Sequence, residues 1–334
     1  MHDAFPQKLI KHQEMQIREA YCEELDEVLD IYGAKEAYFS LPMSRRKRFI
    51  FRCSDARCRS KQNPHVSGVN YDKLVEESEK YVQAHFKSIA QQPHTDECVW
   101  SQNELSRKHD VEVQGGTRIS RKKATDVIDV FTPRLSDTAL LMPRNHNKPE
   151  VLKNQDDEPD ADDSGQVGSL GESTTSRLEV FVDCWSQLDT NDRKNNTIKL
   201  GDQKITYYQA VLNPKHISPS ENGERIVQGL VRPNWWPKDN PIKLYLNFAD
   251  GCEEFREINF ARHLTIEIPL GRINKYRGAA LLLDKLAKAK DPHFYLKAYA
   301  WGELIPSLRG GYLLDLKALD NLTLKVIAKK PKMK

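Results

Sequence analysis

Apolar residues recur at different intervals along the chain, and each interval predicts a different kind of element. Over residues 7–32 they recur at roughly helical spacing between charged residues, so a leading helix is expected there. Residues 37–41 and 48–51 are short apolar runs that favour strands, and the second of them leads directly to Cys53. Residues 71–86 fit either a short amphipathic helix or an irregular strand.

From residue 174 onward, alternation of apolar and polar residues indicates a mainly β structure. A helix is expected over 178–188, a polar loop over 189–196, and one inserted helix over 278–290. Strands are expected over 197–200, 204–208, 225–232, 242–248, 264–268, 293–304 and 312–324. From residue 225 the order of three strands, a helix and two strands favours an OB-like barrel, with another small β-barrel or a sandwich as the alternative.

Composition divides the 334 residues into three parts, and the fold class is expected to be α+β. Residues 1–101 hold the leading helix and a small module. Residues 102–173 are predicted to be a long disordered linker, partly acidic, because they contain few apolar residues and many polar ones. Its apolar segments, 124–131 among them, are interpreted as incidental. Residues 174–334 form the antiparallel, barrel-like domain.

Two short motifs in the first part carry ligands suited to a metal. Cys53 and Cys58 are spaced C-x4-C, and His94 and Cys98 are spaced H-x3-C. Each motif can offer two soft ligands from one turn, and four such ligands complete the closed tetrahedral shell of a structural Zn²⁺. His65 and His85 lie between the motifs and compete for the fourth position.

The surroundings of these motifs indicate a reducing compartment. The chain has six cysteines, mostly scattered, and no signal peptide is recognised, so a cytoplasmic protein is expected rather than a disulfide-bonded one. No run approaches the roughly 20 apolar residues of a membrane-spanning helix. The module has too few apolar residues to fold unaided, so its folding is expected to depend on the metal.

The run from Cys53 to Cys98 resembles the small zinc module of bacterial competence and mobile-element proteins of the CoiA-like kind. The likeness covers about fifty residues and includes a cysteine pair, a His-Phe step at His85 and further ligands. That family usually spaces its pair C-x2-C and continues His-Phe-Ala-His, whereas this chain has C-x4-C and His-Phe-Lys-Ser. The resemblance implies a bacterial or mobile-element system and leaves His85 as an alternative ligand. No nuclease activity is carried over.

Charge and aromatic residues point to a polyanionic partner. Residues 41–61 hold eight basic residues and one acid, whereas 150–173 hold eight acids and one lysine. Basic clusters of this density attract nucleic acid through its phosphates. Trp235 and Trp236 lie between prolines, so a loop that presents them for base stacking is expected. The candidate nucleic-acid residues are Arg45, Arg46, Lys47, Arg48, Arg52, Trp235, Trp236 and Arg309.

These observations predict a zinc-containing protein that binds nucleic acid, with DNA slightly favoured over RNA. A protein–protein adaptor is the first alternative. A metal-dependent nuclease is the second, with Asp250, Glu253, Glu254 and Glu257 as its acidic cluster. No nucleotide-binding glycine loop and no nucleophile elbow is recognised, so an enzyme is not the favoured interpretation.

Overall fold

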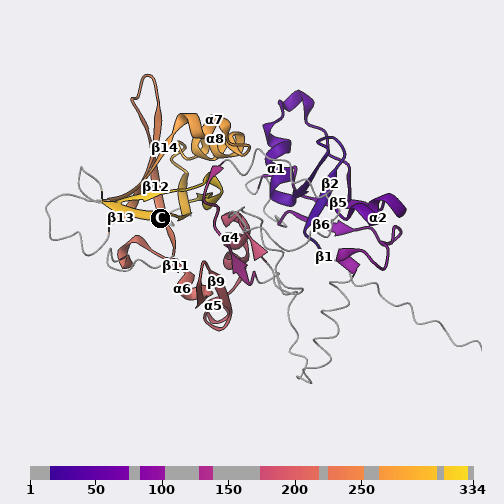
Figure 1. Cartoon of the computed structure of the whole chain (residues 1–334). Helices are drawn as coiled ribbons and strands as arrows, with labels where there is room; N and C mark the ends of the chain where they lie inside the picture. The colour runs from indigo at the N-terminus through magenta and orange to yellow at the C-terminus, as the bar shows by residue number, and fades with distance from the viewer. Residues whose placement is uncertain are drawn as a thin grey trace, which may run out of the picture. The chain divides into compact units, whose positions relative to one another are not determined.

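The computed structural model describes residues 16–74, 83–101, 128–137, 174–217, 225–251, 263–306 and 312–329. They belong to two compact units, an N-terminal unit within residues 16–38 and 43–101 and a C-terminal unit that holds residues 39–42 and the described residues from 128 to 329 (Figure 1). Both units combine helices with mainly antiparallel sheets, which confirms the α+β class. Within these ranges, no helix has the length and apolar character needed to cross a bilayer.

The N-terminal unit is built on a six-stranded antiparallel sheet. Its elements are β1 (Gln16–Ile17), β2 (Glu19–Cys22), β3 (Glu27–Asp30), α1 (Ile31–Ser40), the 3-10 turn η1 (Met43–Arg45), β4 (Phe51–Cys53), α2 (Ala56–Lys61), β5 (His65–Val69) and β6 (His85–Ser88). The strand order is β1-β6-β5-β4-β2-β3. Phe51 lies at the centre of an aromatic cluster with Phe49, Tyr71 and Phe86. Gly68 leaves room for the ring of Phe51, because a Cβ there would lie 2.8 Å from it.

The leading helix predicted over 7–32 is wrong from residue 16, and residues 7–15 lie outside the described residues. Buried and less buried side chains alternate along β2, with Ala20 and Cys22 inside. Asp26 adopts a positive φ of 52° in the turn before β3, a conformation that a helix interior does not contain. Pairing of β2 with both β3 and β4 therefore outweighs the helical spacing.

The strand predicted over 37–41 is also wrong, because residues 37–40 complete α1. The carboxylate of Asp30 accepts a hydrogen bond of 2.6 Å from the backbone N of Gly33, which caps the start of that helix. Residues 34–37 read Ala-Lys-Glu-Ala and are strong helix formers. The strand predicted over 48–51 overlaps β4 only at Phe51, because β4 begins there and ends at Cys53. Residues 75–82 lie outside the described part, and β6 follows them.

A four-stranded sheet and three helices form one layer of the C-terminal unit. The elements are β7 (Val130–Phe131), β8 (Thr174–Thr175), α4 (Leu178–Gln187), α5 (Thr190–Asn195), β9 (Thr197–Leu200), β10 (Gln203–Thr206) and α6 (Tyr207–Ala210). The order is β10-β9-β7-β8. The helix predicted over 178–188 is confirmed as α4. The polar loop predicted over 189–196 is wrong, because Asp189 caps α5 through the backbone N of Asp192.

Part of the predicted linker belongs to this layer. Ile128 and Phe131 are buried in one core with Phe181 of α4 and Leu200 of β9, and β7 pairs in parallel with β8 and β9. The interpretation of 124–131 as an incidental apolar segment is therefore corrected for residues 128–131. Residues 102–127 and 138–173 lie outside the described residues.

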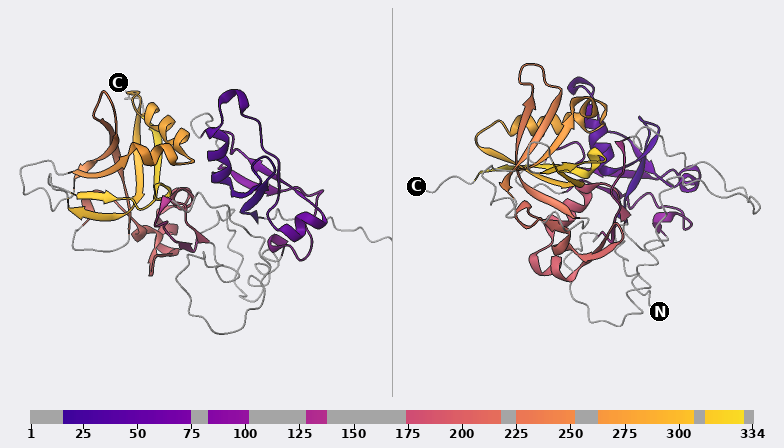
Figure 2. Two further views of the ribbon diagram at one scale, coloured as in Figure 1. Left: turned by 45° about the horizontal axis from the view of Figure 1, so that its top comes forward. Right: turned by 60° about the vertical axis from the view of Figure 1, so that its left-hand side comes forward.

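An eight-stranded sheet forms the rest of the unit. It contains β11 (Val211–Leu212), β12 (Ile226–Trp236), β13 (Lys243–Gly251), β14 (His263–Pro269), β15 (Phe294–Trp301), β16 (Glu303–Pro306), β17 (Tyr312–Asp315) and β18 (Leu322–Ala328). Short 3-10 turns η4 (Pro214–His216) and η6 (Leu319–Asn321) flank it, and α7 (Leu270–Lys275) and α8 (Ala279–Lys288) lie together beside it (Figures 1 and 2). The helix predicted over 278–290 is confirmed as α8.

Alternating side chains of β12 and β15 belong to two different hydrophobic cores. Val227 of β12 and Ala298 of β15 pack in a core with Leu282 and Leu286 of α8. Their neighbours Ile226 and Tyr299 belong instead to the core of α4 and β7. Successive side chains of a strand point to opposite faces, so one sheet can support both cores.

The strand pairing follows a Greek key. β12, β13 and β14 are consecutive antiparallel neighbours, and β15 returns to lie beside β12. The resulting spatial order, fourth-first-second-third, defines that motif. β14 also pairs in parallel with β17, and β15 pairs with β18. Greek-key pairing is shared by several β architectures, and the OB-like barrel stays a prediction.

The segment containing Arg134 is fastened to η6. The backbone N of Arg134 donates to Asn321 Oδ1 at 3.1 Å, and Asn321 Nδ2 donates to the carbonyl of Arg134 at 2.7 Å. Asp320 is 1% exposed, and its carboxylate lies 2.8 Å from Arg134 Nη1 and 3.7 Å from Arg177 Nη1. We name Arg134, Arg177, Asp320 and Asn321 the η6 clamp.

Candidate metal centre

Four metal-ligating side chains converge in the N-terminal unit. The ligand atoms of Cys53, Cys58, His94 and Cys98 all lie within 4.8 Å of one another, and all four residues are buried. The Cys53 and Cys98 sulfurs are 3.6 Å apart, and His94 Nδ1 lies 3.6 Å from the Cys58 sulfur and 3.4 Å from the Cys98 sulfur. The two motifs recognised in the sequence therefore meet, and this group could hold a metal ion.

The local structure explains how each motif delivers its ligands. Cys53 ends β4, and its backbone N donates to the carbonyl of Pro64 at 3.1 Å. Cys58 lies in α2 one turn later. The chain then returns through β5 and β6 to a turn in which the backbone N of Cys98 donates to the carbonyl of Thr95 at 3.0 Å. That turn places His94 and Cys98 on the same side.

Asp55 joins the two motifs. One carboxylate oxygen accepts hydrogen bonds from the backbone N atoms of Arg57 at 2.9 Å and Cys58 at 3.2 Å, which caps α2. The other oxygen accepts a bond of 3.1 Å from the backbone N of Val99. A single carboxylate thus fixes the position of Cys58 relative to Cys98. The sequence contains a signal for the cap, an aspartate before a short helix, but no signal for the second contact.

Arg59 and Trp100 form hydrogen bonds with the turn that follows β4, at Cys53 and Ser54. Arg59 Nη1 donates to the carbonyls of Cys53 at 2.8 Å and Ser54 at 3.1 Å, and its guanidinium lies 4.2 Å from the centre of the Tyr21 ring. Trp100 Nε1 donates to Ser54 Oγ at 2.9 Å. Neither residue was recognised from the sequence, and both act on the backbone that carries the ligands.

The three sulfurs differ in their affinity for protons. The hydrogen bond between the Cys53 and Cys98 sulfurs raises the pKa of Cys53 and lowers the pKa of Cys98. His94 lowers the pKa of Cys98 further, whereas burial raises the pKa of Cys58. A metal cation coordinated by these sulfurs would hold all three as thiolates.

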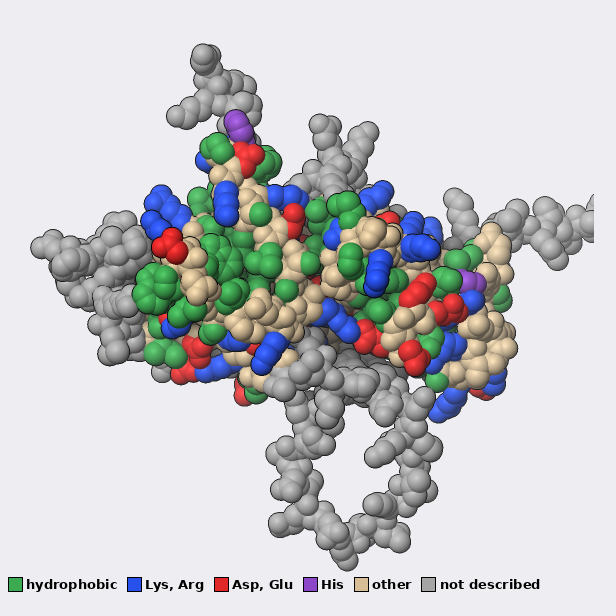
Figure 3. All heavy atoms as spheres, turned by 90° about the horizontal axis from the view of Figure 1, so that it is seen from above, with side chains coloured by type: hydrophobic (Ala, Val, Ile, Leu, Met, Phe, Trp, Pro, Cys, Tyr) green, Lys and Arg blue, Asp and Glu red, His purple; other side chains and the backbone are tan. Residues whose placement is uncertain are grey.

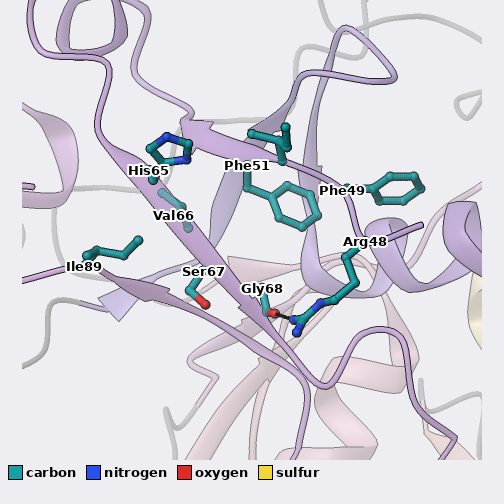
Figure 4. A pocket seen from close by; sticks show the side chains of 9 residues that line it. Arg48, Phe49, Phe51, His65, Val66, Ser67, Gly68 and Ile89 are labelled. Atoms are coloured by element: carbon teal, nitrogen blue, oxygen red, sulfur yellow. Dashed lines mark hydrogen bonds between the residues drawn. The ribbon is translucent and has the colours of Figure 1, made fainter.

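The two alternative histidines lie apart from this group. His85 is exposed, and its Nδ1 lies 2.8 Å from the carbonyl of Gln83. His65 lines a shallow hollow of about 270 Å³ along β5, where Arg48 turns toward the carbonyl of Gly68 (Figure 4). Among the described residues, neither belongs to the cluster of converging ligand atoms.

The predicted basic residues of the run from Arg45 to Arg48 differ in whether their side chains contact other groups of the protein. Arg45 and Lys47 are exposed, and no ion pair or hydrogen bond of their side chains occurs within the described residues. Arg48 donates to the carbonyl of Gly68 at 2.5 Å and lies 3.5 Å from Asp72. Arg46 lies half-buried, with its guanidinium 6.0 Å from the Tyr38 ring centre. Arg45 and Lys47 are thus the members of this run with the least engaged charges.

The positive charge of Arg52 is paired with an acidic side chain of the N-terminal unit. Its Nε donates to Glu23 Oε1 at 2.6 Å, and its Nη1 donates to the carbonyl of Asn63 at 3.2 Å. Arg272 of α7 is held by Asp137 in the same way. Charge density along the sequence does not reveal such pairings, because the acidic partners come from distant segments.

The tryptophan pair does not lie in a loop, which corrects that prediction. Trp235 and Trp236 are the last residues of β12 and pair with Leu244 and Lys243 of β13. Trp235 packs against the core shared with α8, whereas Trp236 is 47% exposed. Alternation along the strand separates the two rings. Arg309 lies outside the described residues.

Replacement of Asp55 tests the connection between the motifs. Asp55→Ala is expected to weaken metal binding about 10- to 100-fold, because residues that orient metal ligands contribute effects of that size. Competition with a chromophoric chelator measures the affinity. Asp96→Ala is the matched control, since Asp96 lies exposed in the second motif. Equal affinities for the two variants would contradict the assigned role.

Comparisons of the chain with protein-family models, with curated proteins and with solved structures found no match. The resemblance to the CoiA-like module stays a prediction.

Proposed function

We propose that the N-terminal unit binds one Zn²⁺ as a structural centre. The convergence of Cys53, Cys58, His94 and Cys98 carries this proposal. Zinc–sulfur bonds of about 2.3 Å and zinc–nitrogen bonds of about 2.0 Å place tetrahedral ligands about 3.5–3.8 Å apart. Three of the six separations between the ligand atoms, at 3.4 and 3.6 Å, are close to those tetrahedral edges, and all six lie within 4.8 Å. Four protein ligands complete the shell, so the centre supports a fold rather than catalysis.

We further propose that this zinc-stabilised unit binds nucleic acid, DNA in preference to RNA, through Arg45 and Lys47. Both side chains are exposed, with no acidic partner among the described residues. Arg45 ends η1 and Lys47 follows it, and both precede β4, whose last residue is the proposed ligand Cys53. Metal binding would thereby fix the segment that carries them. Contacts from such residues would go to phosphates, with little base specificity.

The C-terminal unit would offer a second contact. If its Greek-key sheet is an OB-like barrel, oligonucleotides are expected on the outer face of its strands. Trp236 is exposed at the end of β12, and Arg232 is exposed on the same face of that strand. A ring and a cation that lie on the same face of one strand, four residues apart, suit a stacked base and a phosphate further along the strand. We propose Trp236, rather than Trp235, as the stacking residue.

A protein-binding adaptor is the second candidate function, and one observation favours it. Met43 is 82% exposed and Ile50 is 44% exposed, so two large apolar side chains flank the basic run. Apolar anchors within a charged rim are typical of protein interfaces. On the face drawn in Figure 3, lysines and arginines are interspersed with acidic side chains. A nuclease gains less support, because Asp250 is engaged by Asn213 and Lys215, and residues 252–262 lie outside the described part.

The salt dependence of binding separates these candidates. Zinc-loaded protein is expected to bind a labelled DNA duplex at low salt, with affinity falling linearly against the logarithm of salt concentration. The double variant Arg45→Ala/Lys47→Ala should reduce that slope by about two, since each phosphate contact contributes about 0.9. Fluorescence anisotropy over a salt series gives the slope.

A charge-matched variant controls for a general loss of positive charge. Lys199→Ala/Lys204→Ala removes two exposed lysines from β9 and β10 in the other unit. It should leave the slope unchanged. If zinc-loaded protein binds neither DNA nor RNA at about 50 mM salt, where phosphate contacts are strong, nucleic-acid binding is rejected and the adaptor leads.

A further inference from the structure

Three cationic side chains gather on the C-terminal unit around one acid. Lys297 of β15 and Lys325 of β18 are direct cross-strand partners in the antiparallel ladder. Arg193 of α5 lies close enough to act electrostatically on Lys297. The acid is Asp183 of α4, whose Oδ1 lies 2.7 Å from Lys325 Nζ. We name Arg193, Lys297 and Lys325 the β15–β18 cation cluster.

In the part of the chain that the structure describes, two of these three charges have no counter-charge. Asp183 is already engaged with Lys325, which also donates to Ser186 Oγ at 3.4 Å. Within the described residues, Lys297 and Arg193 form no ion pair. The Arg193 guanidinium lies 3.6 Å from the Trp185 ring centre, and its Nε donates to the carbonyl of Trp185 at 3.0 Å. The contact with Trp185 orients the Arg193 guanidinium but does not neutralise its positive charge.

The arrangement has an energetic cost in the absence of a bound anion. Like charges directly opposite one another on neighbouring strands destabilise a sheet. Burial lowers the pKa of Lys297, and the positive charges of Lys325 and Arg193 lower it further. A lysine that only extends its amine into water would be well solvated, whereas Lys297 is half-buried beside the Tyr299 ring, 5.0 Å from its centre.

We propose that the β15–β18 cation cluster binds a phosphate group. Three cations against one carboxylate leave two positive charges, which match the charge of a phosphate dianion. Arg193 would supply the forked N–H donors that suit phosphate oxygens, and the two lysines would act as point charges. The phosphate would replace the repulsion between Lys297 and Lys325 with attraction to both.

This site is independent of the zinc centre and of the basic run in the N-terminal unit, since every member comes from α4, α5, β15 or β18. The same chemistry fits the backbone of a nucleic acid and a free phosphate or small phosphate ester. Competition distinguishes these sources. A single-stranded oligonucleotide that displaces bound inorganic phosphate assigns the site to a nucleic-acid backbone, and a lack of displacement assigns it to small phosphates.

The test compares zinc-loaded full-length protein with its variants, using inorganic phosphate as the probe against chloride at matched ionic strength. Isothermal titration should detect phosphate binding to the wild type, and Lys297→Met should weaken it about tenfold or more, because one charge-assisted contact is lost. Lys317→Met is the matched control. Lys317 lies between Asp315 at 2.9 Å and Glu303 at 3.0 Å and should contribute nothing to phosphate binding.

Thermal unfolding supplies a readout that a merely structural lysine would not give. Without phosphate, Lys297→Met should unfold at the same or a higher temperature than the wild type, because the repulsion is removed. With phosphate, only the wild type and Lys317→Met should be stabilised. Arg193→Gln, on the short exposed helix α5, provides a second variant should Lys297→Met not fold. Phosphate binding that is absent in the wild type, or unchanged in both cluster variants, overturns the proposal.

Discussion

Freshly reduced protein is expected to contain one equivalent of zinc, and Cys53→Ser or Cys98→Ser is expected to lose it together with the fold of the N-terminal unit. Each substitution leaves three ligands in a shell that needs four. Structural zinc contributes roughly 10–16 kcal/mol in zinc-finger peptides, as much as the whole stability of an ordinary domain. Elemental analysis gives the metal content, and amide hydrogen exchange reports which unit has opened.

The chain contains matched controls for this result. Cys22 and Cys184 are buried thiols outside the ligand group, and burial raises the pKa of Cys22 to about 12, so it is a poor thiolate ligand. Cys22→Ser and Cys184→Ser should keep full zinc. Chelation of the wild type should open the N-terminal unit and spare the C-terminal unit, to which none of the four ligands belongs. A metal-free protein whose N-terminal unit is folded would falsify the structural role.

Asp320→Asn is expected to destabilise the C-terminal unit by about 3–5 kcal/mol, the usual loss when one partner of a buried ion pair is removed. Asp320 is 1% exposed between Arg134 and Arg177, and Tyr276 Oη also donates to it at 3.1 Å. The amide keeps the shape of the side chain but removes the buried negative charge that faces both arginines. Urea unfolding followed by tryptophan fluorescence measures the change in free energy.

A partly exposed ion pair in the same unit provides the comparison. Asp284 lies 3.0 Å from Lys288 one turn away on α8, and exposed helical pairs contribute about 0.3–0.5 kcal/mol. Asp284→Asn should therefore change stability by less than about 1 kcal/mol. If the two variants unfold at the same urea concentration, Asp320 does not hold the η6 clamp together.

The metal ligands were predictable because each pair is local. Cys53 and Cys58 are brought together by one cap and one helical turn, and His94 and Cys98 by another turn, so their spacing marks them as candidate ligands. Their meeting depends on Asp55, whose contact with the Val99 backbone spans 44 residues. No local pattern contains that information. The choice between His94, His85 and His65 likewise required the three-dimensional arrangement.

Elements were predicted best where one face is buried by near neighbours, as in α4 and α8. The leading helix failed because pairing of Ala20 with Cys53 overrides the local spacing. β7 escaped recognition because a strand of two residues has no periodicity, and its partners Thr174 and Leu200 are distant in sequence. Trp235 and Trp236 were assigned to a loop on account of nearby prolines, yet Pro233 itself pairs with Leu246.

The η6 clamp also constrains the order in which the two units can fold during synthesis. The hydrogen bonds of Arg134 cannot form until Asn321 has been synthesised, and Asn321 lies 187 residues later in the chain. The two turns that carry Cys53, Cys58, His94 and Cys98, by contrast, are complete by residue 98 and can come together while most of the chain is still being translated. Domains tend to fold as units during synthesis, N-terminal ones first. A nascent chain stalled before Asn321 should therefore carry one finished unit and one that proteases can still digest.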